Sequence, residues 1–116
     1  MRKRQFCALL LSGASAFTQA QSIVPTTIAN GLSHPWAVAF LPNGNFLVSE
    51  RIGALRVVEP NGKIGQPIRG LPAIAVGGQG GLLDVVLDSD FVRNGTLYFC
   101  FSEPAQQGTG NSTALG

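Results

Sequence analysis

The sequence predicts an all-β protein of the β-propeller class, with about one and a half blades after a signal peptide. Two observations support this fold class. Beyond Gln21 the chain shows no sustained helical periodicity, and its apolar residues form short runs separated by Pro, Gly and Asn. A unit of such runs then restarts after about 50 residues, which is a spacing typical of propeller blades built from short antiparallel strands.

The first unit begins with an apolar run at residues 36–41 (WAVAFL), which is apolar on both faces and suits an inner strand covered on both sides. An Asn-Gly turn separates this run from residues 45–49 (NFLVS), and this pattern predicts a β-hairpin. A third strand is predicted at residues 54–59 (ALRVVE) and a weaker fourth strand at residues 63–69. Together these strands would complete one blade.

The second unit repeats the hairpin, with strands predicted at residues 81–87 (GLLDVVL) and 96–102 (TLYFCFS) and a turn-rich connection between them. The spacing of matching residues is 47 for Trp36 and Leu83 and 53 for Ser49 and Ser102. A β-sandwich also has short strands at regular spacing, but the restart of a whole unit favours the propeller. Residues 104–116 show no strand pattern, so we expect the chain to stop within the second blade, short of a closed ring.

Residues 1–20 have the features of a secretory signal peptide, and residues 21–116 are assigned to the propeller domain. Three basic residues at positions 2–4 precede an apolar run over residues 6–17. Cleavage fits after Ala16 or after Ala20. The apolar run is shorter than the roughly 20 residues that span a bilayer. We therefore expect a periplasmic or secreted protein with no stable membrane anchor.

The charge of the chain gives no sign of a nucleic-acid partner. The sequence has eight basic and six acidic residues, and three of the basic ones belong to the predicted signal peptide. The remaining residues include five basic and six acidic side chains, so they carry no excess of positive charge that could bind nucleic acid. The predicted propeller domain is therefore not expected to bind nucleic acid.

Few residues are candidates for chemistry. The single histidine, His34, lies just before the first inner strand with no general-base partner in the sequence, and a structural role is favoured. Asp84, Asp88 and Asp90 do not have the spacing of a calcium loop, and Asp88-Ser89-Asp90 is expected to form Asx-type turn bonds instead. Cys100 lies in an apolar run and is expected to be a buried core cysteine.

The most distinctive segment is Gly77-Gly78-Gln79-Gly80-Gly81, which leads directly into an inner strand. Glycine permits positive φ and a close approach of the backbone to a ligand, and the Gln79 amide can both donate and accept hydrogen bonds. These properties suit a neutral polyhydroxylated or quinone ligand, and an ordinary glycine-rich turn is an equally good interpretation. There is no lysine and no following helix, so a phosphate-binding loop is excluded.

Three blocks of the sequence resemble the soluble PQQ-dependent sugar dehydrogenases of the glucose/sorbosone dehydrogenase type, which include aldose sugar dehydrogenases. They are residues 31–44 (GLSHPWAVAFLPNG), residues 48–58 (VSERIGALRVV), and residues 78–87 (GQGGLLDVVL) followed by Asp90-Phe91. The third block is the most specific. The resemblance covers nearly all of the chain from about Ile28 onward.

The resemblance implies a six-bladed propeller that binds pyrroloquinoline quinone (PQQ) and calcium and oxidises the C1 hydroxyl of aldoses to lactones. Hydride passes to the quinone, a histidine acts as general base, and an external acceptor takes up the electrons. Gln79 matches the family's glutamine beside sugar and quinone, with Gly78 and Gly80 letting the backbone approach. The resemblance places the base histidine and the calcium ligands beyond Gly116, so no catalytic or metal residue is assigned here and the chain alone is expected to be inactive. The alternative is a non-catalytic propeller module of the NHL-like or lectin-like kind.

Overall fold

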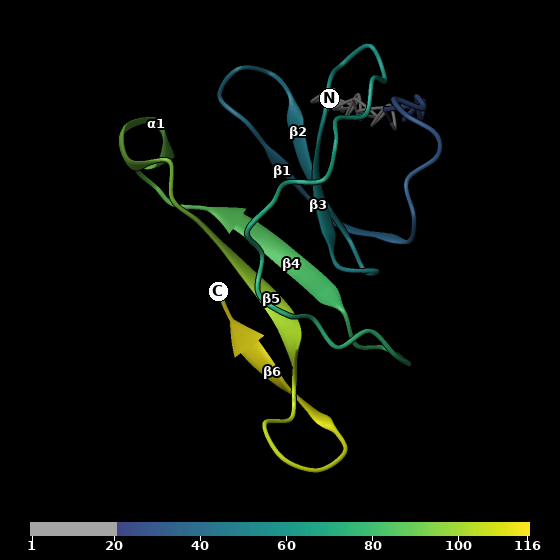
Figure 1. The fold of residues 1–116 in the computed structure, drawn as a ribbon. Helices are drawn as coiled ribbons and strands as arrows, with labels where there is room; N and C mark the ends of the chain where they lie inside the picture. Colours follow the sequence, from purple (N-terminus) through teal and green to yellow (C-terminus); the bar gives the residue numbers. More distant parts are fainter. Residues whose placement is uncertain (1–20) are drawn as a thin grey trace, which may run out of the picture.

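The computed structural model describes residues 21–116 (Figure 1), so the predicted signal peptide at residues 1–20 lies outside the described part of the chain. The described part holds six strands and one short helix. Their bounds are β1 (Pro35–Phe40), β2 (Phe46–Glu50), β3 (Ala54–Val58), β4 (Leu82–Leu87), α1 (Phe91–Asn94), β5 (Leu97–Pro104) and β6 (Asn111–Leu115). No helix among these residues has the length and apolar composition needed to cross a membrane.

The first sheet is the antiparallel meander β1-β2-β3. Its first hairpin turns where the sequence predicts, because Gly44 adopts a φ of +86° and donates its amide to the Leu41 carbonyl at 3.0 Å. The Asn43 side chain accepts the Asn45 amide at 3.1 Å, as an Asx turn requires. The turn residues therefore fix the register of β1 against β2.

The second sheet is the antiparallel meander β4-β5-β6, and α1 lies in the connection between β4 and β5. The helix is a single turn capped at its C-terminus by Gly95, which has a left-handed φ of +63° and donates to the Phe91 carbonyl at 2.8 Å. The predicted turn-rich connection is therefore confirmed. It lies at the opposite end of β4 from the segment that enters this strand (Figure 1).

Two of the strand predictions are wrong. Residues 63–69 form no strand. They lie alongside β3 and are joined to it by two backbone hydrogen bonds, from the Gly65 amide to the Val57 carbonyl and from the Ile68 amide to the Leu55 carbonyl, each 2.8 Å long. Pro67 has no N–H to continue a ladder, which explains why the segment stays irregular. The tail, in contrast, contains β6, which pairs with the last five residues of β5. Most of β6 is exposed, so its own side chains carry little apolar pattern and its backbone pairing makes it a strand. The second sheet is therefore a three-stranded unit like the first.

The core lies between the two sheets, where β4 packs on β1 and β2. Its buried members are Ala39, Leu47, Leu55, Leu82, Val85 and Phe101. Each sheet is a meander of consecutive strands, whereas a sandwich of the immunoglobulin type exchanges strands between its sheets through Greek-key connections. Stacked consecutive meanders are the arrangement of neighbouring propeller blades, and the all-β prediction is confirmed.

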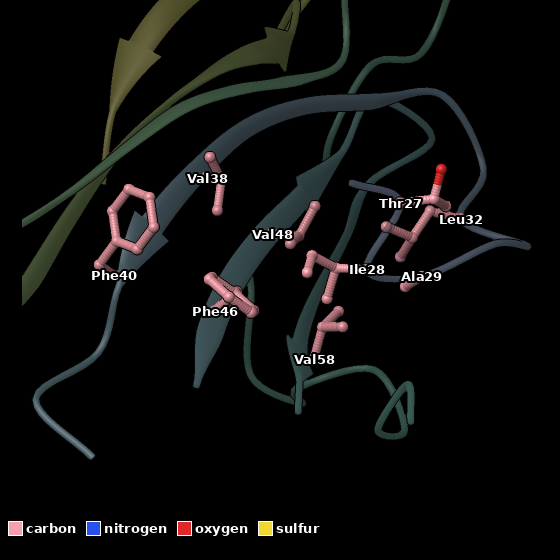
Figure 2. A pocket seen from close by; sticks show the side chains of 9 residues that line it. All are labelled: Thr27, Ile28, Ala29, Leu32, Val38, Phe40, Phe46, Val48 and Val58. Carbon is pink, nitrogen blue, oxygen red and sulfur yellow. The ribbon is translucent and has the colours of Figure 1, made fainter. Parts of the chain in front are cut away.

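The outer face of the first sheet carries an apolar groove of about 440 Å³. Figure 2 shows the segment around Ile28 lying over Val48 and Val58, while Val38 and Phe40 of β1 extend the groove. Phe40 is 73% exposed. Strand β1 thus presents apolar side chains on both faces, as predicted for an inner strand, but only the face toward β4 is covered here.

Candidate functional site

The predicted site residues Gly78, Gln79 and Gly80 lie on a tight turn that leads into β4. The amide of Gly80 donates to the Gly77 carbonyl at 2.7 Å, and the amide of Gly77 donates to the Gly80 carbonyl at 3.3 Å. Gly78 has a φ of +54° and occupies the first central position, where a two-residue type II′ turn places glycine. Gln79 is therefore the one residue of this four-residue turn that has a side chain, and it is exposed.

One side of the turn rests directly on neighbouring strands. A Cβ atom at Gly80 would lie 2.7 Å from Ser102 Oγ, and a Cβ atom at Gly81 would lie 2.0 Å from the Arg51 carbonyl oxygen. Ser102 on β5 is buried; its Oγ accepts the Gly81 amide at 3.1 Å and its own amide donates to the Gly81 carbonyl at 2.9 Å. The glycines at 80 and 81 are thus required by close approach.

The other side of the turn is open. No described atom lies within 4 Å of a Cβ atom built at Gly77 or Gly78. The Gln79 side chain is exposed, so both the N–H and the carbonyl groups of its amide are available to a ligand. The turn therefore offers bare backbone and one neutral polar side chain, which suits the approach of a flat or polyhydroxylated molecule.

Arg51, which follows β2 directly, links this turn to the entry of β1. Its amide donates to the His34 carbonyl at 2.9 Å, and its own carbonyl accepts the Leu82 amide at 3.1 Å. Its guanidinium Nη1 donates to the Gly78 carbonyl. Through these three contacts Arg51 touches the segments that enter both inner strands.

The end of β2 carries two buried polar side chains that fix the surrounding backbone. Glu50 is 1% exposed; its carboxylate accepts the Ser33 amide at 2.6 Å and pairs with Arg56 Nε at 2.8 Å. Ser49 Oγ accepts the Ala37 amide at 3.1 Å and donates to the Leu83 carbonyl at 2.5 Å. Each buried polar group is thus satisfied, as burial requires. The Ser49 bond also joins the two sheets next to the candidate site.

His34 lies at the entry of β1. Its side chain is exposed, its φ is +51°, and Ser33 Oγ lies 3.4 Å from its Nδ1. Among the described residues this is the one polar contact of the ring, so no carboxylate orients it as a general base. His34 contributes to the site through its main-chain carbonyl, which accepts the Arg51 amide.

The acidic residues do not gather into a metal site. Within residues 21–116 no group of three or more His, Cys, Asp or Glu side chains is arranged to hold a metal ion. Asp88 forms the predicted Asx-type turn, because its Oδ1 accepts the Asp90 amide at 2.8 Å. That bond, together with bonds from Asn94 and Tyr98, holds the pKa of Asp88 below its ordinary value.

The prediction of a buried Cys100 is wrong. Its side chain is half-buried on the outer face of the second sheet, in a shallow hollow of about 150 Å³ that it shares with Val86 and Leu115. Alternation along β5 explains the difference, because Phe99 and Phe101 take the positions that face the core.

Sequence reasoning singled out neither Arg51 nor Ser102 as part of the site. The match of Ser49-Glu50 with Ser102-Glu103 contained a usable signal, because both serines accept an amide at the entry of an inner strand. For Arg51 no comparable signal exists in the sequence, since its contact with Gly78 spans 27 positions and depends on the stacking of the sheets.

Comparison with known proteins identifies the family. The family model described as Glucose / Sorbosone dehydrogenase matches residues 32–116, most of the chain. The chain belongs to the glucose/sorbosone dehydrogenase family. It is 37% identical over 117 aligned residues to the aldose sugar dehydrogenase YliI of Escherichia coli (strain K12), an alignment that covers 99% of this chain and 31% of that relative. It is also 39% identical over 88 residues to the uncharacterized protein slr1608 of Synechocystis sp., covering 69% of this chain and 21% of that relative.

Solved structures agree with this family. The soluble aldose sugar dehydrogenase of Escherichia coli in its apo-form superposes with a TM-score of 0.73 at 39% identity, over 78% of this chain and 26% of that structure. The PQQ-bound aldose sugar dehydrogenase of Streptomyces coelicolor gives a TM-score of 0.65 at 29% identity, over 80% of this chain and 27% of that structure. These similarities confirm the β-propeller class. The chain spans between a fifth and a third of the curated relatives that it matches.

Proposed function

We propose that residues 21–116 are the N-terminal part of an exported, periplasmic or secreted PQQ-dependent dehydrogenase that oxidises the C1 hydroxyl of aldose sugars to lactones. The observation that supports this proposal is the exposed Gln79 amide on an open, glycine-framed turn, in a chain of the glucose/sorbosone dehydrogenase family. A relative whose name states aldose sugar dehydrogenase and a family structure with bound PQQ point to the same substrate and cofactor classes.

The described residues fit one edge of a quinone and sugar site. The open space beside Gly77 and Gly78 lets a planar ring approach the backbone, and the Gln79 amide can donate to a quinone or hydroxyl oxygen and accept from a sugar hydroxyl. They do not fit a calcium site, since residues 21–116 contain no cluster of suitable ligands. We therefore assign Gln79, Gly78 and Gly80 to the neighbourhood of sugar and cofactor, and no residue of this part to calcium.

In the proposed reaction the residues of this chain bind and orient. When bound, PQQ supplies the acceptor for the hydride that leaves C1 of the sugar, and an external acceptor later removes the two electrons. Gln79 would hold the sugar by a hydrogen bond near the reacting hydroxyl, which restricts its orientation relative to the acceptor. The turn that carries Gln79 is fixed from beneath by Ser102 and Arg51. Removal of the hydroxyl proton is assigned to the histidine base expected beyond Gly116.

The proposal is tested on a full-length enzyme in which residues 21–116 are joined to the downstream part of the Escherichia coli relative. Loaded with PQQ and calcium, the enzyme should reduce a redox dye in the presence of glucose. Gln79→Ala should lower kcat/KM for the aldose about tenfold, because one hydrogen bond worth about 1.4 kcal/mol in the transition state is lost. Initial rates of dye reduction over a range of glucose concentrations measure this effect.

Gln66→Ala is the matched control, because Gln66 is also an exposed glutamine but lies on the segment that follows β3, outside the turn. Its kinetics should equal those of the parent. Unchanged kinetics of Gln79→Ala would leave Gln79 as a turn residue only. Binding of glucose without any dye reduction would instead favour a non-catalytic propeller module.

A further inference from the structure

We propose that Arg51 is a positioning residue that sets the place of the Gln79 side chain, an inference that rests on the function proposed for Gln79. Arg51 does not belong to the turn. It holds the turn from the neighbouring blade, through its guanidinium group on one side and its main chain on the other.

The main-chain contacts of Arg51 fix where its side chain starts. Its amide is bonded to the His34 carbonyl at 2.9 Å and its carbonyl to the Leu82 amide at 3.1 Å. A Cβ atom at Gly81 would lie 2.7 Å from Arg51 Cγ, so the side-chain stem lies directly against the backbone of Gly81. The stem therefore runs along the base of the turn and brings the guanidinium to the Gly78 carbonyl.

Ser102 holds the two flanks of the turn through the Ala75 and Gly81 amides, but the tip of the turn needs a contact of its own. Three of its four residues are glycine, which has the largest conformational freedom to lose on ordering. Of its two internal bonds, the one from Gly77 to Gly80 is long at 3.3 Å. Gly78 is the residue directly before Gln79, and in the described part of the chain its carbonyl is bonded to Arg51. The direction of the Gln79 side chain therefore depends on this bond.

Arg51 differs in this from the other arginines with side-chain contacts. Arg56 pairs with the carboxylate of Glu50 and Arg93 with that of Asp90, both within 3 Å. Arg56 also donates to the Gly65 carbonyl at 3.1 Å, but within residues 21–116 Arg51 forms no ion pair and its guanidinium bonds a main-chain carbonyl alone. A guanidinium stays protonated at any ordinary pH and is a rigid planar donor. It can therefore hold the Gly78 carbonyl in one fixed direction.

The first test measures the turn itself and needs neither cofactor nor sugar. Amide hydrogen exchange is followed by mass spectrometry in the peptide that spans residues 75–82 of the unloaded full-length enzyme described above. Arg51→Met keeps the stem but removes the donor, and exchange in this peptide should rise about tenfold, as expected for the loss of one hydrogen bond to a charged group. Arg51→Lys keeps a donor and should restore most of the protection. Arg93→Met, a change at an exposed arginine on α1, should leave it unchanged.

The second test asks whether Arg51 acts through Gln79. In the loaded enzyme Arg51→Met should lower kcat/KM for glucose about tenfold, and Arg51→Lys should recover at least a third of the parent value. In the Gln79→Ala background, Arg51→Met should have less than a twofold further effect, because residues that act as a unit are non-additive. The pH profile of kcat/KM should keep its shape in Arg51→Met.

Unchanged exchange in Arg51→Met, or effects of Arg51→Met and Gln79→Ala that multiply in the double variant, would overturn the positioning role. These outcomes differ from a failure of the proposed function. If the parent enzyme shows no sugar-dependent turnover, the proposed function is contradicted, and the exchange measurement alone decides whether Arg51 orders the turn.

Discussion

Gly81 shows how strictly a single residue can be constrained beside the candidate site. Its position leaves 2.0 Å between a built Cβ atom and the Arg51 carbonyl oxygen, a distance at which two heavy atoms cannot remain. The obstacle is main chain, which is held by the bond from the Leu82 amide. A side chain at position 81 therefore cannot be accommodated by a change of rotamer, and the neighbouring main chain must move.

At the residue scale, Gly81→Ala should destabilise the protein by about 3 kcal/mol, at the upper end of the range for overpacking. Urea unfolding of the purified chain, followed by circular dichroism, measures the change. Gly77→Ala is the matched control, because no described atom lies within 4 Å of the added methyl group, and it should change stability by less than about 1 kcal/mol. Equal stability of the two variants would show that the strands shift freely at this point.

Among the elements, the connection between β4 and β5 is held largely by one carboxylate. Asp88 accepts three bonds, from the Asp90 amide at 2.8 Å, from Asn94 Nδ2 at 3.0 Å and from the Tyr98 hydroxyl at 3.1 Å. The first lies within the turn, the second reaches the last residue of α1, and the third reaches β5. A single side chain thus joins the turn, the helix and the following strand.

At the element scale, these bonds make the connection sensitive to pH at both extremes. The amide of Asp90, then Asn94 and Tyr98, lower the pKa of Asp88 below its ordinary value of 3.8, so its stabilising effect is complete above that value and is lost as the pH falls through the lowered pKa. The bond to Asp88 also raises the pKa of Tyr98 above its ordinary value of 10.0. That contribution is complete below 10.0 and is lost as the pH rises through the raised pKa.

Carboxyl ¹³C NMR of Asp88 over acidic pH tests this assignment. Tyr98→Phe should raise the pKa of Asp88 only part of the way to its ordinary value, since the Asp90 amide, the largest cause of the shift, remains. Asn94→Ala should act in the same direction. A pKa of Asp88 that does not respond to either substitution would contradict the three-bond arrangement.

The elements also show what the sequence could and could not predict. Five of the six strands follow from apolar runs and Asn-Gly turns, because each of them contributes side chains to a buried face. Strand β6 does not, because four of its five residues are exposed and backbone pairing with β5 creates it. Gln79 was found through the glycines around it, whereas Arg51 depends on a contact between residues 27 positions apart.

At the largest scale, residues 21–116 form a stack of two sheets with one shared core and two outer faces. The core side chains between the sheets are buried, but the outer face of the first sheet keeps Val38 51% and Phe40 73% exposed within an apolar groove. Exposed apolar side chains that gather in one groove form a surface to which an apolar molecule can bind. The apolar surface that this face exposes to solvent can therefore be measured with a dye that binds such surfaces.

At the scale of the molecule, the purified chain should bind the dye ANS and enhance its fluorescence. Phe40→Ser should reduce this signal by about half, because it removes the most exposed aromatic ring of the groove. Ile68→Ser is a suitable control, since Ile68 is also exposed but does not line the groove. If both variants bind ANS as the parent does, the groove is not the apolar surface that the dye detects.

The unequal surroundings of the glycines in the turn bear on how the specificity of such a site could be redesigned. Gly80 and Gly81 lie against Ser102 and Arg51. Gly78 has a positive φ, which residues other than glycine rarely adopt. Gly77 combines open space with an ordinary φ. A combinatorial library that varies positions 77 and 79 and keeps glycine at 78, 80 and 81 would therefore explore new ligand preferences while losing few members to misfolding.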